Sequence, residues 1–149
     1  MRYVAVVGPG QATADQERMA EAVGRGLAER GAVVVCGGLG GVMAAVCRGA
    51  GSANGRTVGI LPGNDRSEAN PWVEIVIATG LGELRNGLIV RNADAVIAVG
   101  GGHGTLSEIA LALKAGLPVL GLGSWEIEGV EPAATPADAV ARACDGAAT

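Results

Sequence analysis

The segment Val99–Thr105, with the sequence Val-Gly-Gly-Gly-His-Gly-Thr, is the part of the chain best suited to binding chemistry. It follows a short apolar run typical of a buried strand, and apolar residues at helical spacing come after it. Glycines leave backbone N–H groups open to an anion, and the positive end of a helix dipole favours negative charge there. The Thr105 hydroxyl can donate to the same anion. We therefore predict that a phosphate is bound by Gly101, Gly102, His103, Gly104 and Thr105.

Established nucleotide motifs do not describe this turn. No lysine precedes Thr105, so the pattern G-x-x-x-x-G-K-[ST] of magnesium-dependent triphosphatases is absent. The dinucleotide fingerprint is also incomplete, because Gly8–Thr13 lacks its third glycine and Cys36 stands where it has an acidic residue. A structural alternative stays open: the glycines only permit a tight connection, and Thr105 with Glu108 forms a T-x-x-E capping box.

A second glycine turn, Cys36-Gly-Gly-Leu-Gly-Gly-Val-Met43, also follows an apolar run. Two such turns facing one crevice would hold the phosphate and sugar of a single ligand. On this interpretation the binding residues include Gly38, Gly40, Gly41 and Met43. The alternative is that these glycines only allow a helix to pack closely on the sheet.

Arg85 and Glu108 are the titratable candidates, since each is expected in a helix near the carboxyl end of a strand. A carboxylate stabilises oxocarbenium character, and an arginine steadies a phosphate or polarises a leaving group, so these two residues are the predicted catalytic pair if the chain is an enzyme. A salt bridge between two helices explains them equally well. His103 is the only histidine of the chain, and we predict no metal site.

Apolar β-branched runs alternate with helical patterns along the whole sequence. Strands are predicted at Tyr3–Val7, Ala32–Val35, Arg56–Leu61, Val73–Ala78, Asp94–Val99 and Leu117–Leu122. Helices are predicted at Ala14–Arg30, from Val42 to about Gly51, at Leu81–Asn92, at Thr105–Ala115 and after Thr135-Pro136. Thr13-Ala-Asp-Gln16 matches a capping box at the start of the first of these helices. This alternation predicts a Rossmann-like, doubly wound α/β fold: a parallel sheet in a three-layer α/β/α arrangement, with ligands at the carboxyl ends of the strands. We expect an exposed loop at Asn64–Asn70, and Gly123–Ala134 has no assignment.

Composition narrows the class of protein. A chain of 149 residues suits one domain over residues 1–149, and its net charge of −4 offers no basic field for nucleic acid. No apolar stretch is long enough for a membrane span. Cys36, Cys47 and Cys144 lack C-x-x-C spacing, which favours reduced thiols in a cytoplasmic protein over disulfides or zinc. Trp72 and Trp125 are equally consistent with stacking on a ligand ring and with covering a core.

Four segments, in this order, resemble the LOG ("Lonely Guy") superfamily, whose members are often mislabelled as lysine decarboxylases. The segments are Cys36–Met43, Gly55–Pro62, Arg85 with the later Ala93-Asp-Ala, and Gly100–Glu108. The resemblance covers about Tyr3–Leu122. It implies hydrolysis of a nucleoside 5′-monophosphate to free base and ribose 5-phosphate, with a P-G-G-x-G-T-x-x-E turn and an Arg-Lys pair, and it implies a homo-oligomer, either a dimer or a tetramer. Arg85, Thr105 and Glu108 match that pattern.

Other positions depart from the LOG pattern. Gly100 replaces its proline, Ser107 a glutamate and Asn86 its lysine, while Cys36 and Ala44 replace glycines. The variant with Arg-Asn and Val-Gly-Gly-Gly-x-Gly-Thr-Leu-Ser-Glu is more similar to a sister branch that includes molybdenum cofactor carrier proteins, which bind a pterin phosphate without transforming it. The sequence therefore favours a protein that binds a nucleotide or a molybdopterin-type phosphate and requires no further cofactor. The alternative is a phosphoribohydrolase for AMP-like nucleotides, and in neither case a lysine decarboxylase.

Overall fold

Seven strands form one parallel sheet in the computed structural model, which describes residues 1–145. The strand order is β4-β3-β2-β1-β5-β6-β7, and every neighbouring pair is parallel. The strands are β1 (Tyr3–Val7), β2 (Val33–Cys36), β3 (Arg56–Leu61), β4 (Ile75–Ala78), β5 (Ala95–Val99), β6 (Val119–Leu122) and β7 (Val130–Pro132).

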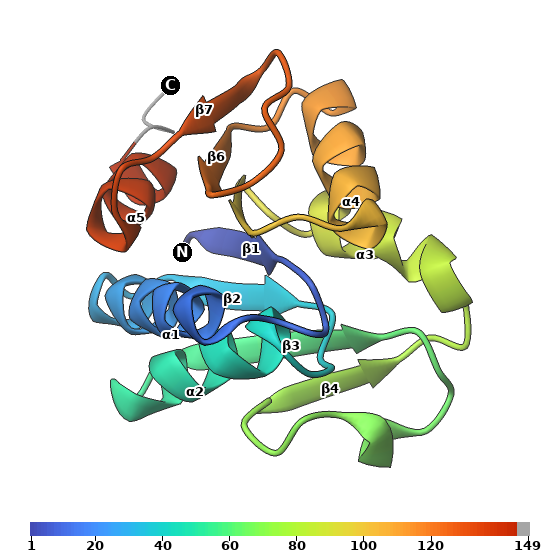
Figure 1. Cartoon of the computed structure of the whole chain (residues 1–149). Helices are drawn as coiled ribbons and strands as arrows, with labels where there is room; N and C mark the ends of the chain where they lie inside the picture. Colours follow the sequence, from blue (N-terminus) through green and yellow to red (C-terminus); the bar gives the residue numbers. More distant parts are fainter. Residues whose placement is uncertain (146–149) are drawn as a thin grey trace.

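Helices lie on both faces of this sheet, as Figure 1 shows. α1 and α2 cover one face together with α5, and α3 and α4 lie on the other. Their bounds are α1 (Ala14–Glu29), α2 (Val42–Ser52), α3 (Arg85–Arg91), α4 (His103–Lys114) and α5 (Pro136–Asp145), with single 3-10 turns η1 (Arg66–Glu68) and η2 (Gly82–Leu84). The predicted doubly wound, three-layer α/β/α fold is confirmed. No helix within residues 1–145 is long and apolar enough to cross a membrane.

The central strands are apolar along their whole length because both of their faces are covered. In β1, Val4 and Val6 belong to the core under α1, α2 and α5, whereas Ala5 and Val7 belong to the core under α3 and α4. β5 is buried throughout in the same way. Continuous apolar runs, rather than alternating ones, are what a parallel sheet inside two helical layers requires.

The chain changes direction at β1. It first builds the sheet outward from β1 to β4 and then returns to place β5 on the other side of β1, with Val7 opposite Ala98. The helices that follow β1 and β5 lie on opposite faces of the sheet, so a crevice opens between the two strand ends. Ligands of open α/β sheets bind at such switch points.

α1 and α2 touch backbone to backbone at two glycines. A methyl group added to Gly24 would lie 2.1 Å from the Val46 carbonyl oxygen, and one added to Gly49 would lie 2.0 Å from the Glu21 carbonyl oxygen. No side chain fits at either position, so the two helices are held at one separation and one register.

Most element boundaries lie within two residues of those predicted, and the larger differences have local causes. The predicted helix Leu81–Asn92 becomes the 3-10 turn η2 followed by α3, and Gly82 has a φ of +62° that prevents an α-helix from beginning at Leu81. α4 begins at His103, two residues earlier than predicted. The unassigned segment Gly123–Ala134 contains β7, an edge strand too short to show a periodic pattern.

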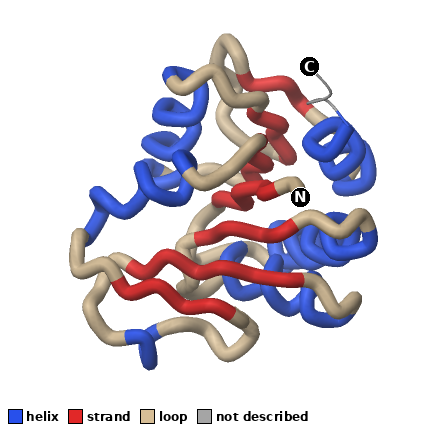
Figure 2. The backbone as a smooth tube through the Cα atoms, turned by 180° about the vertical axis from the view of Figure 1, so that it is seen from behind, coloured by secondary structure: helices blue, strands red, loops and turns tan. Residues whose placement is uncertain are grey.

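One part of the sheet has no helical cover. Figure 2 shows no helix in front of β2, β3 and β4 on the face opposite α1 and α2. Ile75 and Ile77 of β4 point to this face and are 43% and 46% exposed. A depression of about 300 Å³ lies there, lined by Tyr3, Val35, Val58, Ile60, Ile77 and Asn92.

Candidate functional site

A pocket of about 400 Å³ opens at the carboxyl ends of β1 and β5. Its walls come from the turns after β1, β2 and β5 and from α3 and α4. Besides Val6 and Val7, the lining consists of Gly8, Pro9, Gly10, Gly37, Leu39, Met43, Arg85, Asn86, Gly101, Gly102, Gly104, Thr105 and Glu108.

The turn after β5 leads directly into α4, and no side chain caps this helix. Gly102 is the N-cap residue, with a φ of +109° and no side-chain cap. Thr105 is the third residue of the helix, is only 3% exposed, and its hydroxyl makes no hydrogen bond within residues 1–145. The Thr105–Glu108 capping box considered from the sequence is therefore wrong. The first N–H groups of α4, which a helix leaves unpaired, and this hydroxyl are available to a ligand.

Gly100 holds the turn close to the start of α1. Its φ is +75°, and an added Cβ would lie 2.6 Å from Nε2 of Gln16. Gln16 is fixed by the predicted capping box, which is present: its N–H donates to Thr13 Oγ1 at 3.1 Å, and its Oε1 accepts from Thr13 N–H at 3.0 Å. Proline fixes φ near −65°, so the proline of the related motif does not fit at this position.

The end of β1 forms the opposite wall of the pocket. A Cβ on Gly8 would lie 2.5 Å from the Val99 carbonyl oxygen, so the β1 and β5 turns are in direct contact. The Val42 N–H donates to the Pro9 carbonyl oxygen at 3.1 Å, which ties the β1 turn to the start of α2. Close contacts between the β1 turn, the β5 turn and the start of α2 thus define the shape of the crevice.

The second glycine turn contributes Gly37, Leu39 and Met43 to the pocket, and of these three only Met43 belongs to the predicted set. Met43 lines the pocket as predicted. Gly38, Gly40 and Gly41 are not among the lining residues, and at Gly41 the chain passes so close to the β1 turn that a Cβ would lie 2.3 Å from the Pro9 carbonyl oxygen. For these three glycines, close packing is the role that their surroundings support.

Arg85 places a buried cation at the pocket. It is the first residue of α3 and is 9% exposed. Its Nε donates to the Ile60 carbonyl oxygen at 2.9 Å, and its Nη1 donates to Asn86 Oδ1. Its Nη2 lies against Gly37, where an added Cβ would be 2.7 Å away, and makes no hydrogen bond within residues 1–145. Burial lowers the pKa of Arg85, opposed by the charge of Glu108, yet guanidinium stays protonated at neutral pH.

Asn86 and Ser107 are two departures from the LOG pattern, and their side chains are hydrogen-bonded to each other. Asn86 Nδ2 donates to Ser107 Oγ at 3.2 Å, and Ser107 Oγ donates to the Gly104 carbonyl oxygen at 2.9 Å. A continuous set of donors therefore runs from Arg85 through Asn86 and Ser107 to the start of α4. This neutral pair fixes the guanidinium relative to the glycine turn before α4.

Glu108 supplies a carboxyl group that is only 8% exposed. Burial raises the pKa of Glu108 to about 7, even though the charge of Arg85 acts in the opposite direction. Within residues 1–145 no ion pair joins the two side chains, so the salt bridge considered from the sequence is not formed. At neutral pH the pocket thus contains one cation and one carboxyl group that is about half ionised.

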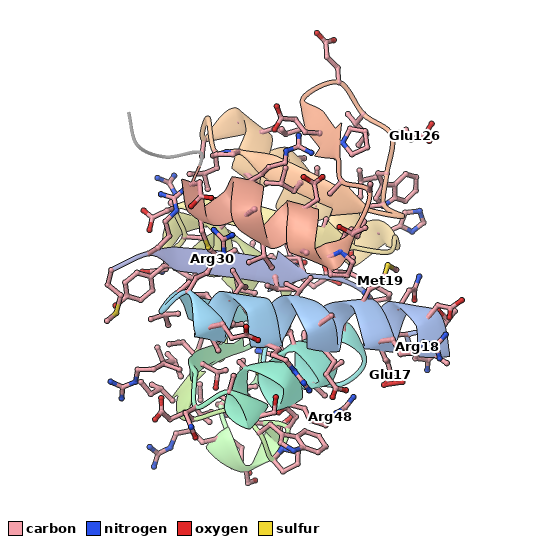
Figure 3. All side chains as sticks on the ribbon, turned by 90° about the vertical axis from the view of Figure 1, so that its left-hand side faces the viewer. Glu17, Arg18, Met19, Arg30, Arg48 and Glu126 are labelled. Atoms are coloured by element: carbon pink, nitrogen blue, oxygen red, sulfur yellow. The ribbon has the colours of Figure 1, made fainter. Side chains whose placement is uncertain are left out.

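His103 and Trp125 lie beside the mouth of the pocket. The His103 ring is stacked on the Trp125 indole, with 6.4 Å between centroids and 20° between planes. The indole N–H of Trp125 donates to the Gly102 carbonyl oxygen at 3.0 Å. His103 itself is not among the lining residues. Figure 3 shows Glu126, next to Trp125, at the same end of the molecule as Glu17 and Arg18 in the first turn and a half of α1.

The cysteines are not arranged around the pocket as ligands. Cys36 and Cys47 are buried thiols whose sulfurs are 3.5 Å apart, and Cys144 is half-buried. The hydrogen bond with Cys47, together with burial, raises the pKa of Cys36 well above its usual value. In the part of the chain that the structure describes, no group of three His, Cys, Asp or Glu side chains is placed to hold a metal ion.

Sequence reasoning found part of the lining and missed part. The predicted residues that meet at the pocket are Met43, Arg85, Gly101, Gly102, Gly104, Thr105 and Glu108. The residues that it missed include Gly8, Gly10, Gly37, Leu39 and Asn86. The Gly8-Pro9-Gly10 turn was open to detection, because it ends the first strand of a doubly wound sheet. No signal in the sequence linked Trp125 to the β5 turn.

The sequence is similar to a known protein family and to an individual protein. The sequence matches the SLOG cluster4 family over residues 1–144. It is 46% identical over 141 residues to an uncharacterised protein of Archaeoglobus fulgidus. The aligned region covers 94% of this chain and 93% of that protein.

Two solved structures are similar along nearly their whole length. The molybdenum cofactor binding protein from the phototrophic bacterium Rippkaea orientalis is 39% identical, with a TM-score of 0.88 over 92% of this chain and 91% of that one. The molybdenum cofactor carrier protein of Chlamydomonas reinhardtii is 35% identical, with a TM-score of 0.87 over 97% of this chain and 96% of that one.

Proposed function

The chain belongs to the SLOG cluster4 family, and from this membership and the pocket geometry we propose that it binds a phosphorylated pterin of the molybdenum cofactor type and carries it unchanged. The observation that carries the proposal is the pairing of a buried, half-satisfied guanidinium, Arg85, with the uncapped start of α4. The similarity to two proteins named for binding and carrying molybdenum cofactor supports the choice of ligand.

Each group of the pocket has a defined part in binding the phosphate. The backbone N–H groups of Gly101, Gly102 and Gly104 surround the anion, and the dipole of α4 stabilises its charge. The Thr105 hydroxyl donates to one phosphate oxygen. Arg85 supplies a full positive charge through its free Nη2. The pocket volume of about 400 Å³ is within the range of small-ligand sites.

The pair Asn86 and Ser107 favours carrying over hydrolysis. In the LOG pattern these two positions are a lysine and a glutamate, which would add an acid–base pair beside the ligand. Here both are neutral and use their hydrogen bonds on each other and on the Gly104 carbonyl oxygen. The chain thus retains the groups that hold a phosphate and lacks two that would act on a glycosidic bond.

A phosphoribohydrolase related to the LOG enzymes is the second candidate, and Glu108 is the observation that favours it. A carboxyl group with a pKa of about 7 suits general acid–base catalysis at neutral pH. Incubation with AMP, followed by chromatography, separates the two functions. We expect no free adenine; steady release that Glu108→Gln abolishes would establish the hydrolase and refute the carrier.

Thr105 offers the first direct test of the carrier proposal. Molybdenum cofactor released anaerobically from a molybdoenzyme is expected to bind the protein, and Thr105→Val is expected to weaken this binding roughly 10-fold, because one hydrogen bond to a charged oxygen is lost. Valine has the shape of threonine, so the buried site stays filled. Molybdenum retained after gel filtration, measured by elemental mass spectrometry, gives the affinity.

Thr105→Ser is the matched control, since it keeps the hydroxyl and removes only a methyl group. Its affinity is expected to stay within about threefold of the wild-type value. Wild-type protein that retains no molybdenum would remove the carrier proposal. Equal binding by Thr105→Val and wild-type protein would move the phosphate away from the start of α4.

We also propose that the uncovered face of β2–β4 is buried between copies of this chain. Ile75 and Ile77 are large apolar residues exposed side by side on that face, which is unusual for a surface that stays in water. Ile77→Lys is expected to convert the dimer or tetramer to a monomer in multi-angle light scattering, because the lysine charge would be buried at the contact. Glu74→Lys, at the residue directly before β4, is the control for added charge. A wild-type monomer would contradict the proposal.

Two further expectations from the sequence remain predictions. They are the organisation of residues 1–149 as one domain and a cytoplasmic location.

A further inference from the structure

We propose that the loop Gly123–Gly129 forms a second compartment, which holds the flat heteroaromatic ring of the ligand whose phosphate lies at the start of α4. This inference rests on the proposed function and extends it to the ring. The loop joins β6 to β7 and is part of the segment Gly123–Ala134, to which the sequence assigns no element.

A cavity of about 360 Å³ lies under this loop. Its floor and walls come from the carboxyl end of β6, the loop itself and β7. The side chains of Trp125, Ile127, Val130 and Pro132 provide apolar surface, and Gly121 and Gly123 leave space at its base. Glu126, which also lines it, lies at the carboxyl end of the strands in Figure 3, the edge at which the phosphate pocket opens.

Ser124 provides the polar group of this cavity. Its Oγ is buried and has no hydrogen-bond partner within residues 1–145. An unpaired buried hydroxyl is costly, and native proteins normally pair such a group with a ligand, a water or another protein atom. Ser124 lines the cavity, so a ligand edge that enters it can supply the missing partner.

Trp125 connects the two compartments. It lines the second cavity, and its indole N–H donates to the carbonyl oxygen of Gly102, a residue that lines the phosphate pocket. A Cβ on Gly101 would lie 3.6 Å from the same indole nitrogen. One indole ring therefore separates the phosphate turn from the second cavity, a span that a ring joined to a phosphate through a short linker can bridge.

The chemistry of this cavity selects a class of ligand. Apolar walls favour the faces of a flat ring, and a single hydroxyl favours an edge that carries nitrogen or a carbonyl oxygen. Pterins and purines have both features, whereas a sugar has polar groups on all sides. The compartment therefore recognises the ring end of a phosphorylated heteroaromatic compound.

The competing position for the ring is the other end of the phosphate pocket, at Leu39 and Met43. That end is also apolar, but it offers no unpaired buried side-chain hydroxyl among the described residues. The two positions lie on opposite sides of the β5 turn, and variants on each side distinguish them.

The test compares a ring-bearing probe with a ringless one. The probes are 6-hydroxymethylpterin monophosphate, followed by its own fluorescence anisotropy, and inorganic phosphate, measured as its competitor. Ser124→Ala is expected to weaken binding of the pterin probe roughly fivefold, because one neutral hydrogen bond is lost. Its affinity for inorganic phosphate should stay unchanged. Ile127→Ala, which shortens a half-exposed wall residue, is expected to act in the same direction by about threefold.

Two controls accompany these variants. Glu128→Ala changes the same loop at an exposed residue outside the cavity lining, and the affinity for both probes should stay unchanged. Met43→Ala changes the competing position and, on this proposal, should alter the two probes equally.

The outcomes separate this inference from the proposed function. If Thr105→Val weakens binding of the pterin probe while Ser124→Ala and Ile127→Ala do not, the ring lies elsewhere and the inference fails, but the phosphate site stands. A selective loss of pterin binding in Met43→Ala would then place the ring at the competing position. If wild-type protein binds the pterin probe no more tightly than inorganic phosphate and does not retain molybdenum cofactor, both fail.

Discussion

Replacing Arg85 by glutamine is expected to weaken binding of molybdenum cofactor about 100-fold, the largest loss that any single side chain of the pocket should cause. Among the described residues that line the pocket, Arg85 is the only one with a cationic side chain, and its free Nη2 is already positioned. A charge-assisted hydrogen bond in a partly desolvated site is worth several times one at the surface. Affinity measured by molybdenum retention gives the result directly.

Arg85→Lys distinguishes charge from geometry. Lysine keeps the charge but cannot donate to the Ile60 carbonyl oxygen, to Asn86 and to a phosphate from one planar group. We expect a loss of roughly 10- to 30-fold, between the values for wild-type protein and the glutamine variant.

Arg91→Gln is the matched control, because it removes an exposed arginine from the same helix, and its affinity should stay within about twofold. Circular dichroism on all three variants identifies any that fail to fold. A folded Arg85→Gln protein with wild-type affinity would overturn the assignment of Arg85 to the phosphate.

Glu108 should make the protein less stable as pH rises from about 4.5 to 7. The pKa of Glu108 is about 7 in the folded protein, above the value near 4.5 in an unfolded chain. The folded state therefore binds the proton more tightly, and the free energy of unfolding falls between about pH 4.5 and 7 and then becomes level. A difference of about 2.5 pH units corresponds to roughly 3 kcal/mol.

Glu108→Gln removes this dependence. Its free energy of unfolding should equal that of wild-type protein near pH 4 and exceed it by roughly 3 kcal/mol at pH 8, measured by urea denaturation. Glu128→Gln, which removes an exposed carboxylate, should keep the wild-type slope. Parallel curves for wild-type protein and Glu108→Gln would mean that this carboxyl group is ionised throughout.

The same titration should appear in anion binding. An ionised Glu108 repels a bound anion, so affinity should fall as pH rises through 7. Sulfate keeps its charge over this range, which makes it a suitable probe. We expect a decrease of about 10-fold from pH 6 to pH 8 in wild-type protein and none in Glu108→Gln. An unchanged wild-type affinity would place the anion away from Glu108.

The sequence was most informative where local pattern and local chemistry coincide. The glycine turn before α4, the capping box at Thr13 and the alternation that led to the parallel sheet are all recorded in neighbouring residues. Arg85, Thr105 and Glu108 were identified as a group through their order along the chain, and their side chains meet at one pocket.

What sequence reasoning missed depends on adjacency across the sheet. Gly8 lines the pocket only because β1 lies next to β5, and strand order leaves no periodic trace. Asn86 and Ser107 lie 21 positions apart in the sequence, on two different helices, so their substitutions looked like two separate departures. Trp125 reaches the β5 turn from a loop that follows no repeating pattern.

The glycine crossing of α1 and α2 has a consequence for how the pocket responds to its ligand. Gln16 of α1 lies against Gly100 in the β5 turn, and the first residue of α2 donates a hydrogen bond to Pro9 in the β1 turn. Both turns are therefore fixed to a pair of helices that cannot slide past each other. The site is preorganised, and little conformational entropy of the protein is lost on binding. Free and ligand-bound forms should therefore differ little in backbone. Under the proposed carrier function, a protein that receives the ligand would meet the same surface before and after its release.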